Sequence, residues 1–319
     1  MRPQVKIVHG HSLPELEDQV SRSLGGEFDI TIDPSVLGGW SNITLLTYSQ
    51  GHTFVLKLPA TKGPFRSHPY TREYKVMNFL SREGLCPRPV KIGRLNDEER
   101  TPFMVTEYVK GVVRPSLTEM TGEDLGNLRV ALTHLSALRP PGVKSYRKPS
   151  DYLSSIAEVV EQSAQAATSL SRNLGRLLGS FQGVVERVGD LTDSSCVWSR
   201  RTMHGDLQES NVVIQPDRVV LIDLESCSIG EPLLDLAYLF SQDEGSMLSI
   251  RHEVLSAGDE SRIIERLRPL AVISAVGWSL QFLERLEAGL IEDSALAPDA
   301  GARVSRYVED KMQYLTSLR

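Results

Sequence analysis

The stretch from Thr202 to Leu224, TMHGDLQESNVVIQPDRVVLIDL, decides the fold of this chain. Two short runs rich in β-branched residues, 212–214 and 219–222, are separated by Gln-Pro-Asp-Arg. Proline and aspartate favour tight turns, because proline fixes its own φ and aspartate hydrogen-bonds to nearby backbone. The stretch therefore predicts a β-hairpin.

Three polar residues flank this hairpin. Asp206 lies in the loop that enters it, Asn211 follows at its start, and Asp223 stands at its exit. Carboxylate and amide oxygens are the ligands that hard cations such as Mg²⁺ prefer. With Asn211 and Asp223 on a metal ion, Asp206 remains as a base for a substrate hydroxyl. Phosphoryl transfer needs these parts together with a means of holding a triphosphate. The alternative is a polar hairpin with capping acids, and the neighbouring His-Gly and Leu-Glu pairs make it less favoured.

A family resemblance rests on this stretch. The residues His204-Gly205-Asp206, the Asn211 that follows after four residues, and the run LIDLE at 221–225 resemble the aminoglycoside phosphotransferase family. The run GEPLLDLA at 230–237 fits the segment that follows in that family. The resemblance implies an α+β, bilobal protein-kinase-like fold with a β-rich N-terminal lobe and a mostly helical C-terminal lobe. It also implies Asp206 as the catalytic base, Asn211 and Asp223 as Mg²⁺ ligands, and ATP as phosphate donor.

Two departures from protein kinases concern the acceptor. This chain has His-Gly-Asp and Asp-Leu-Glu where protein kinases carry His-Arg-Asp and Asp-Phe-Gly. Both departures argue against a protein substrate. The resemblance therefore implies a small-molecule acceptor.

A glycine-rich loop precedes the first long strand pattern. It contains Gly38, Gly39, Ser41 and Asn42. Backbone N–H groups in such a loop can approach phosphate, because glycine has no Cβ in the way. On its own the loop is more typical of an ordinary hairpin turn. The resemblance favours a phosphate-binding role, since members of the family carry a similar loop.

An acid and a lysine are expected to pair behind this loop. Lys57 lies on a predicted strand, 54–58, and Glu73 lies in a predicted helix, 69–82. Glu73 falls on or beside the apolar face of that helix, where an unpaired charge is costly. We predict that Lys57 pairs with Glu73 and reaches the nucleotide phosphates. The alternative is that Glu73 pairs with Arg72 or Arg82 at the surface.

The boundary between the two lobes is expected where strand patterns stop. The run 103–109 reads as a strand and is followed by Lys-Gly. We predict lobes at 1–110 and 111–319, the first binding the nucleotide and the second carrying the catalytic loop and substrate site. The resemblance implies that backbone groups near Glu107 and Val109 bind the adenine edge.

The C-terminal region gives less specific signals. Residues 259–319 are predicted to be helical. Trp278, Phe282, Glu284 and Glu287 are candidates for a substrate pocket, although aromatic residues at helical spacing are more often core. Glu225 is either a further metal contact or a solvated acid.

Composition narrows the class of protein. The chain has 319 residues, 40% hydrophobic content and a net charge of −6. This balance is unlike a disordered chain and argues mildly against nucleic acid, which usually calls for a basic face. No stretch is long and apolar enough for a membrane span. Three cysteines without CxxC spacing favour a reducing compartment. We expect a soluble cytoplasmic protein.

The sequence thus predicts an ATP- and Mg²⁺-dependent phosphotransferase that acts on a hydroxyl of a small molecule of the aminoglycoside, choline, amino-alcohol or sugar type. Two alternatives are a non-catalytic nucleotide-binding regulatory module and an atypical protein kinase. The acceptor, the choice between ATP and GTP, the number of metal ions and the oligomeric state stay open.

Overall fold

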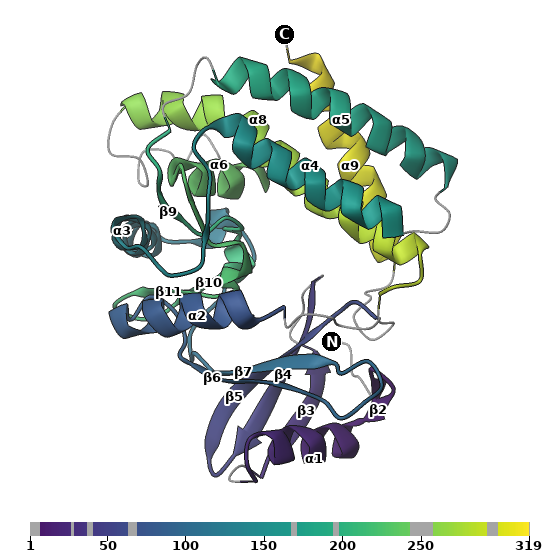
Figure 1. The fold of residues 1–319 in the computed structure, drawn as a ribbon. Coiled ribbons are helices and arrows are strands. Elements are labelled where there is room, and N and C mark those ends of the chain that lie inside the picture. The colour runs from purple at the N-terminus through teal and green to yellow at the C-terminus, as the bar shows by residue number, and fades with distance from the viewer. Residues whose placement is uncertain are drawn as a thin grey trace.

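The computed structural model describes residues 7–26, 29–36, 41–62, 69–166, 171–193, 198–242, 258–291 and 299–318. In these ranges the chain forms a β-rich N-terminal part and a larger, mostly helical C-terminal part. In Figure 1 the N-terminal part lies below the C-terminal part. This is the α+β, bilobal arrangement that the sequence predicts.

The N-terminal part is built on an antiparallel sheet with strand order β3-β4-β5-β7-β6. Its strands are β3 (Thr31–Val36), β4 (Asn42–Ser49), β5 (His52–Pro59), β6 (Pro89–Arg94) and β7 (Pro102–Glu107). The last strand ends two residues before the predicted limit at Val109. A short hairpin, β1 (Ile7–Val8) and β2 (His11–Ser12), and the helix α1 (Leu13–Ser23) precede the sheet.

The two faces of the sheet have different neighbours. Leu56 and Leu58 of β5 are buried in an apolar cluster with Leu16 and Val20 of α1. Successive side chains of a strand point to opposite faces. Lys57, between the two leucines, therefore points to the face away from this cluster.

The helix α2 (Thr71–Leu80) lies against this second face and continues into the 3-10 turn η1 (Ser81–Glu83). The apolar residues Val76, Met77 and Leu80 are buried, and Glu73 is buried beside them. They share one apolar cluster with Met104 of β7 and with the core of the C-terminal helices. This helix therefore connects the packing of the two parts.

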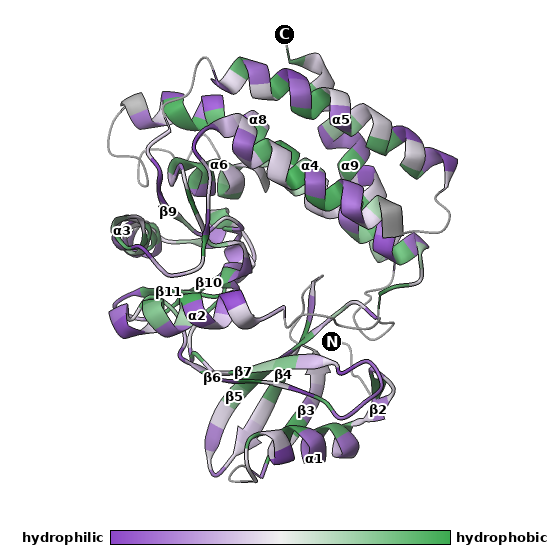
Figure 2. Cartoon of the chain, viewed as in Figure 1, coloured by the Kyte–Doolittle hydropathy of each residue, from purple (hydrophilic) through white to green (hydrophobic). Residues whose placement is uncertain are grey.

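The C-terminal part is dominated by long helices. They are α3 (Gly122–Ala137), α4 (Pro149–Ala166), α5 (Arg172–Asp193), α6 (Leu233–Gln242), α8 (Gly258–Glu287) and α9 (Ala300–Ser317). Figure 2 shows hydrophilic and hydrophobic residues alternating along α4 and α5, as in helices with one buried face. In the part of the chain that the structure describes, no helix combines the length and apolarity needed to cross a membrane.

Short strands connect these helices around the predicted hairpin. A three-stranded sheet has the order β8-β12-β9, formed by β8 (Lys144–Ser145), β12 (Ser228–Gly230) and β9 (Arg201–Met203). It brings residues near 144 beside the segment that follows the hairpin. This juxtaposition shapes one side of the site described below.

Candidate active site

The predicted hairpin is present. Strands β10 (Val212–Ile214) and β11 (Val219–Leu221) pair antiparallel, with Val213 opposite Val220. The backbone N–H of Gln215 donates to the carbonyl of Arg218 across the turn at 2.9 Å. Because the hairpin is short, the residues at its two ends are held close together. Its entry loop carries Asp206 and Asn211, and its exit carries Asp223.

The entry loop is fixed by a buried carboxylate. Asp235, at the start of α6, accepts the backbone N–H of His204 at 2.6 Å and that of Gly205 at 2.8 Å. Burial raises the pKa of Asp235 to about 6, while His204 and the two N–H donors act in the opposite direction. The ring Nε2 of His204 lies 2.9 Å from the carbonyl oxygen of Ile222, next to Asp223. His204 and Asp235 therefore support the loop.

A glycine is required at the turn of this loop. Gly205 has a φ of 86°, and a Cβ on it would lie 2.3 Å from the carbonyl oxygen of Ser226. A larger residue would be strained and would also collide with backbone. The backbone of Asp223 is itself left-handed, with a φ of 62°. The two acid-bearing segments thus pack against each other with little freedom.

Asp206 carries an unusual carboxyl group. Asn211 Nδ2 donates to its carbonyl oxygen at 2.9 Å and lies 3.4 Å from its Oδ2. Tyr238 of α6 also donates a hydrogen bond to this carboxylate. Burial, followed by the nearby charge of Asp223, raises the pKa of Asp206 to about 6, and these donors partly offset the rise. Its carboxyl group can therefore take up and release a proton near neutral pH.

The predicted ion pair is present and is part of a larger cluster. Lys57 Nζ lies 2.9 and 3.0 Å from the two carboxylate oxygens of Glu73, and 2.7 Å from Oδ1 of Asp223. Glu225, in the 3-10 turn η4 (Leu224–Ser226), is 3.8 Å from the same nitrogen. The surface alternative, in which Glu73 pairs with a neighbouring arginine, is therefore wrong. A lysine from the sheet joins an acid from α2 to acids after the hairpin.

This cluster holds more negative than positive charge. Burial acts to lower the pKa of Lys57, but Asp223, Glu73 and Glu225 outweigh it and hold that pKa well above its usual value. Burial raises the pKa of Glu73 to about 7, although Lys57 opposes the change. Burial and Asp223 also raise the pKa of Glu225. The three carboxylates offer oxygens that all lie within 4.8 Å of one another. Because one ammonium faces three carboxylates, a cation would be stabilised here.

The end of the predicted phosphate loop lies beside this cluster. Asn42 begins β4 and is buried; its Nδ2 donates to Glu225 Oε2 at 3.2 Å, and its Oδ1 accepts from Tyr70 OH at 2.9 Å. The carbonyl oxygen of Ser41 accepts from Ala60 N–H at 2.9 Å. Gly38 and Gly39 lie outside the described residues. The described end of the loop therefore reaches the acids after the hairpin.

The segment between the two parts contacts the hairpin closely. Glu107 ends β7, and its carboxylate pairs with Arg88 at 2.7 Å; Val109 lies just beyond. Val112 exchanges backbone hydrogen bonds with Ile214 at 2.9 and 2.8 Å. A Cβ on Gly111 would lie 2.6 Å from the carbonyl oxygen of Ile214. The connection therefore passes directly along β10, next to the hairpin.

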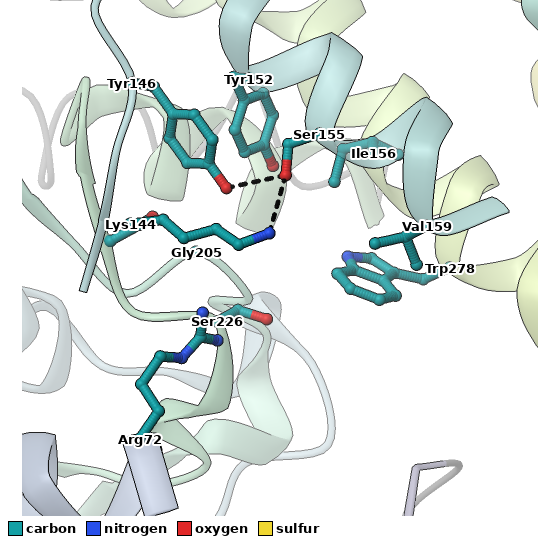
Figure 3. Close-up of a pocket in the computed structure, with 11 residues that line it drawn as sticks. Arg72, Lys144, Tyr146, Tyr152, Ser155, Ile156, Val159, Gly205, Ser226 and Trp278 are labelled. Atoms are coloured by element: carbon teal, nitrogen blue, oxygen red, sulfur yellow. Dashed lines mark hydrogen bonds between the residues drawn. The ribbon is translucent and has the colours of Figure 1, made fainter. Parts of the chain in front are cut away.

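A cavity that is partly open to solvent borders the entry loop at Gly205. Figure 3 shows side chains from α2, β8, α4 and α8 converging on it. It is lined by Arg72, Lys144, Tyr146, Tyr152, Ser155, Ile156, Val159, Gly205, Ser226, Ser228 and Trp278. Gly205, which precedes Asp206 in the chain, is part of this lining, so the cavity borders the loop that carries Asp206.

The comparisons with known proteins agree with this geometry. A model of the phosphotransferase enzyme family matches residues 35–270. The chain belongs to this family. It is therefore a phosphotransferase. A comparison with curated proteins finds no significant match.

Solved structures share the fold of this phosphotransferase. A thermostable mutant of aminoglycoside phosphotransferase APH(4)-Ia, in ternary complex with AMP-PNP and hygromycin B, is 15% identical, with a TM-score of 0.62 over 95% of this chain and 99% of that chain. Spectinomycin phosphotransferase APH(9)-Ia, in complex with ADP and spectinomycin, is 9% identical, with a TM-score of 0.60 over 95% and 97%. Choline kinase from Cryptosporidium parvum Iowa II is 12% identical, with a TM-score of 0.59 over 91% and 88%. At these identities the likeness shows the fold alone.

Several residues of the phosphotransferase site were not singled out from the sequence. Tyr238 follows Asp235 by three positions in a helix, a spacing that shares one face and was a usable signal. Tyr70 and Lys144 had no such signal, because their partners are distant in sequence. Of the four pocket candidates on α8, Trp278 lines the cavity, whereas Phe282 and Glu284 are buried and Glu287 accepts hydrogen bonds from Ser171.

Proposed function

We propose that this phosphotransferase transfers the γ-phosphoryl group of ATP, with Mg²⁺, to a hydroxyl group of a small molecule. The observation that carries the proposal is the position of Asp206. This carboxylate has a raised pKa, lies near Asp223 of the acid cluster around Lys57, and belongs to a loop that borders the cavity at Gly205. Phosphoryl transfer needs mainly positioning and charge neutralisation, together with a group that orients the attacking hydroxyl.

The chemistry of the acid cluster fits Mg²⁺. This ion takes oxygen ligands and is usually held by one or two carboxylates plus phosphate oxygens and water. Asp223 is the main candidate ligand, with Asn211 as the predicted second and Glu225 as a further carboxylate at the same place. A bound Mg²⁺ would neutralise charge on the transferring phosphoryl group. Its positive charge would also balance the surplus of carboxylates.

The remaining residues of the cluster fit nucleotide binding. Lys57, held by Glu73, would contact phosphate oxygens, and the 38–42 loop would cover them from the sheet side. Backbone groups at Glu107 and Val109 would bind the adenine edge. In this arrangement residues 1–110 form the nucleotide-binding lobe, and residues 111–319 carry the catalytic loop and the acceptor site.

Asp206 would act on the acceptor. A hydroxyl that enters from the cavity would donate to its carboxylate, which takes the proton as the oxygen attacks the γ-phosphorus. The pKa of about 6 suits this task, because the group is mostly deprotonated at neutral pH but is still basic enough to accept a proton.

The similar structures widen the range of acceptors that a test must include. APH(4)-Ia was solved with hygromycin B and APH(9)-Ia with spectinomycin, and a choline kinase shares the fold. These compounds and enzymes differ in chemistry. The acceptor class therefore has to be inferred from the residues that line this chain's own cavity.

The test measures ADP release from Mg-ATP across hydroxylated acceptors that differ in charge: aminoglycosides, choline, sugars, amino alcohols and hydroxy acids. We expect one class to stimulate release, and chelation of Mg²⁺ to abolish it. Mg-dependent ATP binding without stimulation by any class would instead support a non-catalytic nucleotide-binding module.

A further inference from the structure

The acceptor cavity carries cations in its wall. Arg72 extends from α2 and Lys144 from β8, and both side chains point into the cavity in Figure 3. Among the described residues that line it, none is an aspartate or a glutamate. An amine or quaternary ammonium entering here would meet like charges, which disfavours it.

The ammonium of Lys144 has little to hold it in place. Its Nζ lies 3.4 Å from Ser155 Oγ, and that oxygen also contacts Tyr146 OH at 3.1 Å. No carboxylate of the described residues pairs with this lysine. Lys144 is an exposed residue, but its side chain is part of the cavity lining and its ammonium joins this hydroxyl network. An acceptor oxygen bearing negative charge would satisfy its donors.

Arg72 is held from the other side of the cavity. Its guanidinium donates to the backbone carbonyl of Glu225, which fixes it at the junction between the cavity and the acid cluster. That contact uses one of several N–H donors, and arginine can present the others as a pair to a carboxylate or phosphate. The carboxylate of Glu225, whose backbone carbonyl Arg72 contacts, accepts from Asn42 instead.

The rest of the wall is apolar or aromatic. Ile156 and Val159 of α4 face Trp278 of α8, and Tyr146 stacks edge-on against Tyr152 with ring centroids 5.3 Å apart. Tyr152 OH donates to Ser274 Oγ at 2.8 Å, so this tyrosine presents mainly its ring surface to the cavity. Such walls suit a planar or hydrophobic body with a small number of polar groups.

We propose that the acceptor of this phosphotransferase is an anionic hydroxy compound, with a hydroxyl for Asp206 and an acid group for Lys144 and Arg72. The inference rests on the proposed function and specifies its substrate class. It separates this chain from enzymes whose acceptors are cationic, such as choline.

The test uses matched acceptors that differ only in charge. Each set contains a hydroxy acid, its neutral amide and the corresponding amino alcohol, with both aliphatic and aromatic bodies. ADP release is measured for the wild type and for Lys144→Glu. Hydrogen bonds to charged groups contribute enough that we expect the substitution to raise the KM for the acid about 10- to 100-fold, with kcat little changed. It should also narrow or reverse the preference for the acid over the amine.

The matched control is Lys75→Glu, which makes the same change at an exposed position of α2. It should leave the acid preference unchanged, and its KM for ATP should match that of the wild type. If Lys144→Glu instead raises the KM for ATP and leaves that for the acid unaltered, Lys144 serves the nucleotide and the inference is wrong.

The outcomes separate the inference from the function beneath it. Turnover of the amino alcohols in preference to the acids would overturn the anionic acceptor while keeping the small-molecule kinase. A lack of turnover with every member of the sets, in a protein that binds Mg-ATP, would count against the kinase function itself.

Discussion

The acid cluster around Lys57 and the cavity beside Gly205 adjoin each other but carry opposite charge. In the first, Glu73, Asp223 and Glu225 surround one ammonium. In the second, Arg72 and Lys144 enter a cavity whose described lining contains no acid. A bound cation would stabilise the acid cluster, and a bound anion would stabilise the cavity. This difference is the basis for proposing a cation at the acid cluster and an anion in the cavity.

The two regions also differ in how firmly they are held. Asp235 fixes the entry loop through two backbone N–H bonds, and Gly205 packs too closely on Ser226 to accept a side chain. By contrast, Lys144 is exposed and has one long contact, to Ser155. Chemistry that is common to a family needs a rigid frame. The choice of acceptor can rest on side chains that are easier to change.

Of the changes within the two regions, the largest effect is expected when the acid cluster loses a charge. Asp223→Asn keeps the shape of the side chain but removes a charge from the proposed Mg²⁺ site. We expect kcat/KM for Mg-ATP to fall by about 10²–10³, in the range found when one electrostatic contact to the reacting group is lost. The control is Asp217→Asn, the same change at an exposed position of the hairpin turn. Equal activity in the two variants would exclude Asp223 as a ligand.

A second prediction separates stability from activity at the buried ion pair. Lys57→Met leaves Glu73 buried without its main partner, and we expect a loss of about 3–5 kcal/mol in the free energy of unfolding. The double variant Lys57→Met/Glu73→Met should recover most of this loss, because two apolar side chains replace the pair. Activity should be about 10²-fold below that of the wild type in both the single and the double variant. Denaturant unfolding and ADP release together check this, and recovered activity in the double variant would contradict a role for Lys57 at the phosphates.

A smaller effect is expected from pH. The pKa of Asp206 is raised from 3.8 to about 6, and a base works only when deprotonated. Activity should therefore rise with pH up to about 6, roughly tenfold per unit, and level off above it. The charge of Asp223 contributes to the raised pKa of Asp206. The residual activity of Asp223→Asn should therefore reach half of its plateau value at a lower pH than the wild type does. A wild-type profile that is flat down to pH 4.5 would show that this carboxyl group does not govern the rate.

Much of the acid side could be predicted from the sequence. The hairpin followed from residues with short spacing, and the Lys57–Glu73 pair followed from a charge on an apolar helix face. In such cases one local pattern fixes both the backbone and the side chain. The predicted strand 103–109 was two residues too long at its end, since β7 ends at Glu107. Tyr108 and Val109 have strand-forming side chains, but the chain there already turns toward β10.

The acceptor side could not be predicted in the same way. Its residues come from α2, β8, α4 and α8, which the fold brings together over more than 200 positions of sequence. Lys144 reads as an ordinary surface lysine, and Ser155 as a polar helix position. Trp278 was a candidate only within a stripe that is mostly core. Periodicity shows which face of a helix is buried, but it does not show which buried residues border a cavity.

The most direct test concerns Asp206, whose loop borders the cavity at Gly205 and whose carboxylate lies near Asp223. Steady-state kinetics of Asp206→Asn, with the acceptor that stimulates ADP release, separate binding from transfer. We predict that kcat falls by about 10²–10⁴ while the KM for ATP stays within roughly threefold of the wild type. A kcat close to that of the wild type, or a loss confined to ATP binding, would contradict the placement of Asp206 as the base that receives the acceptor's proton.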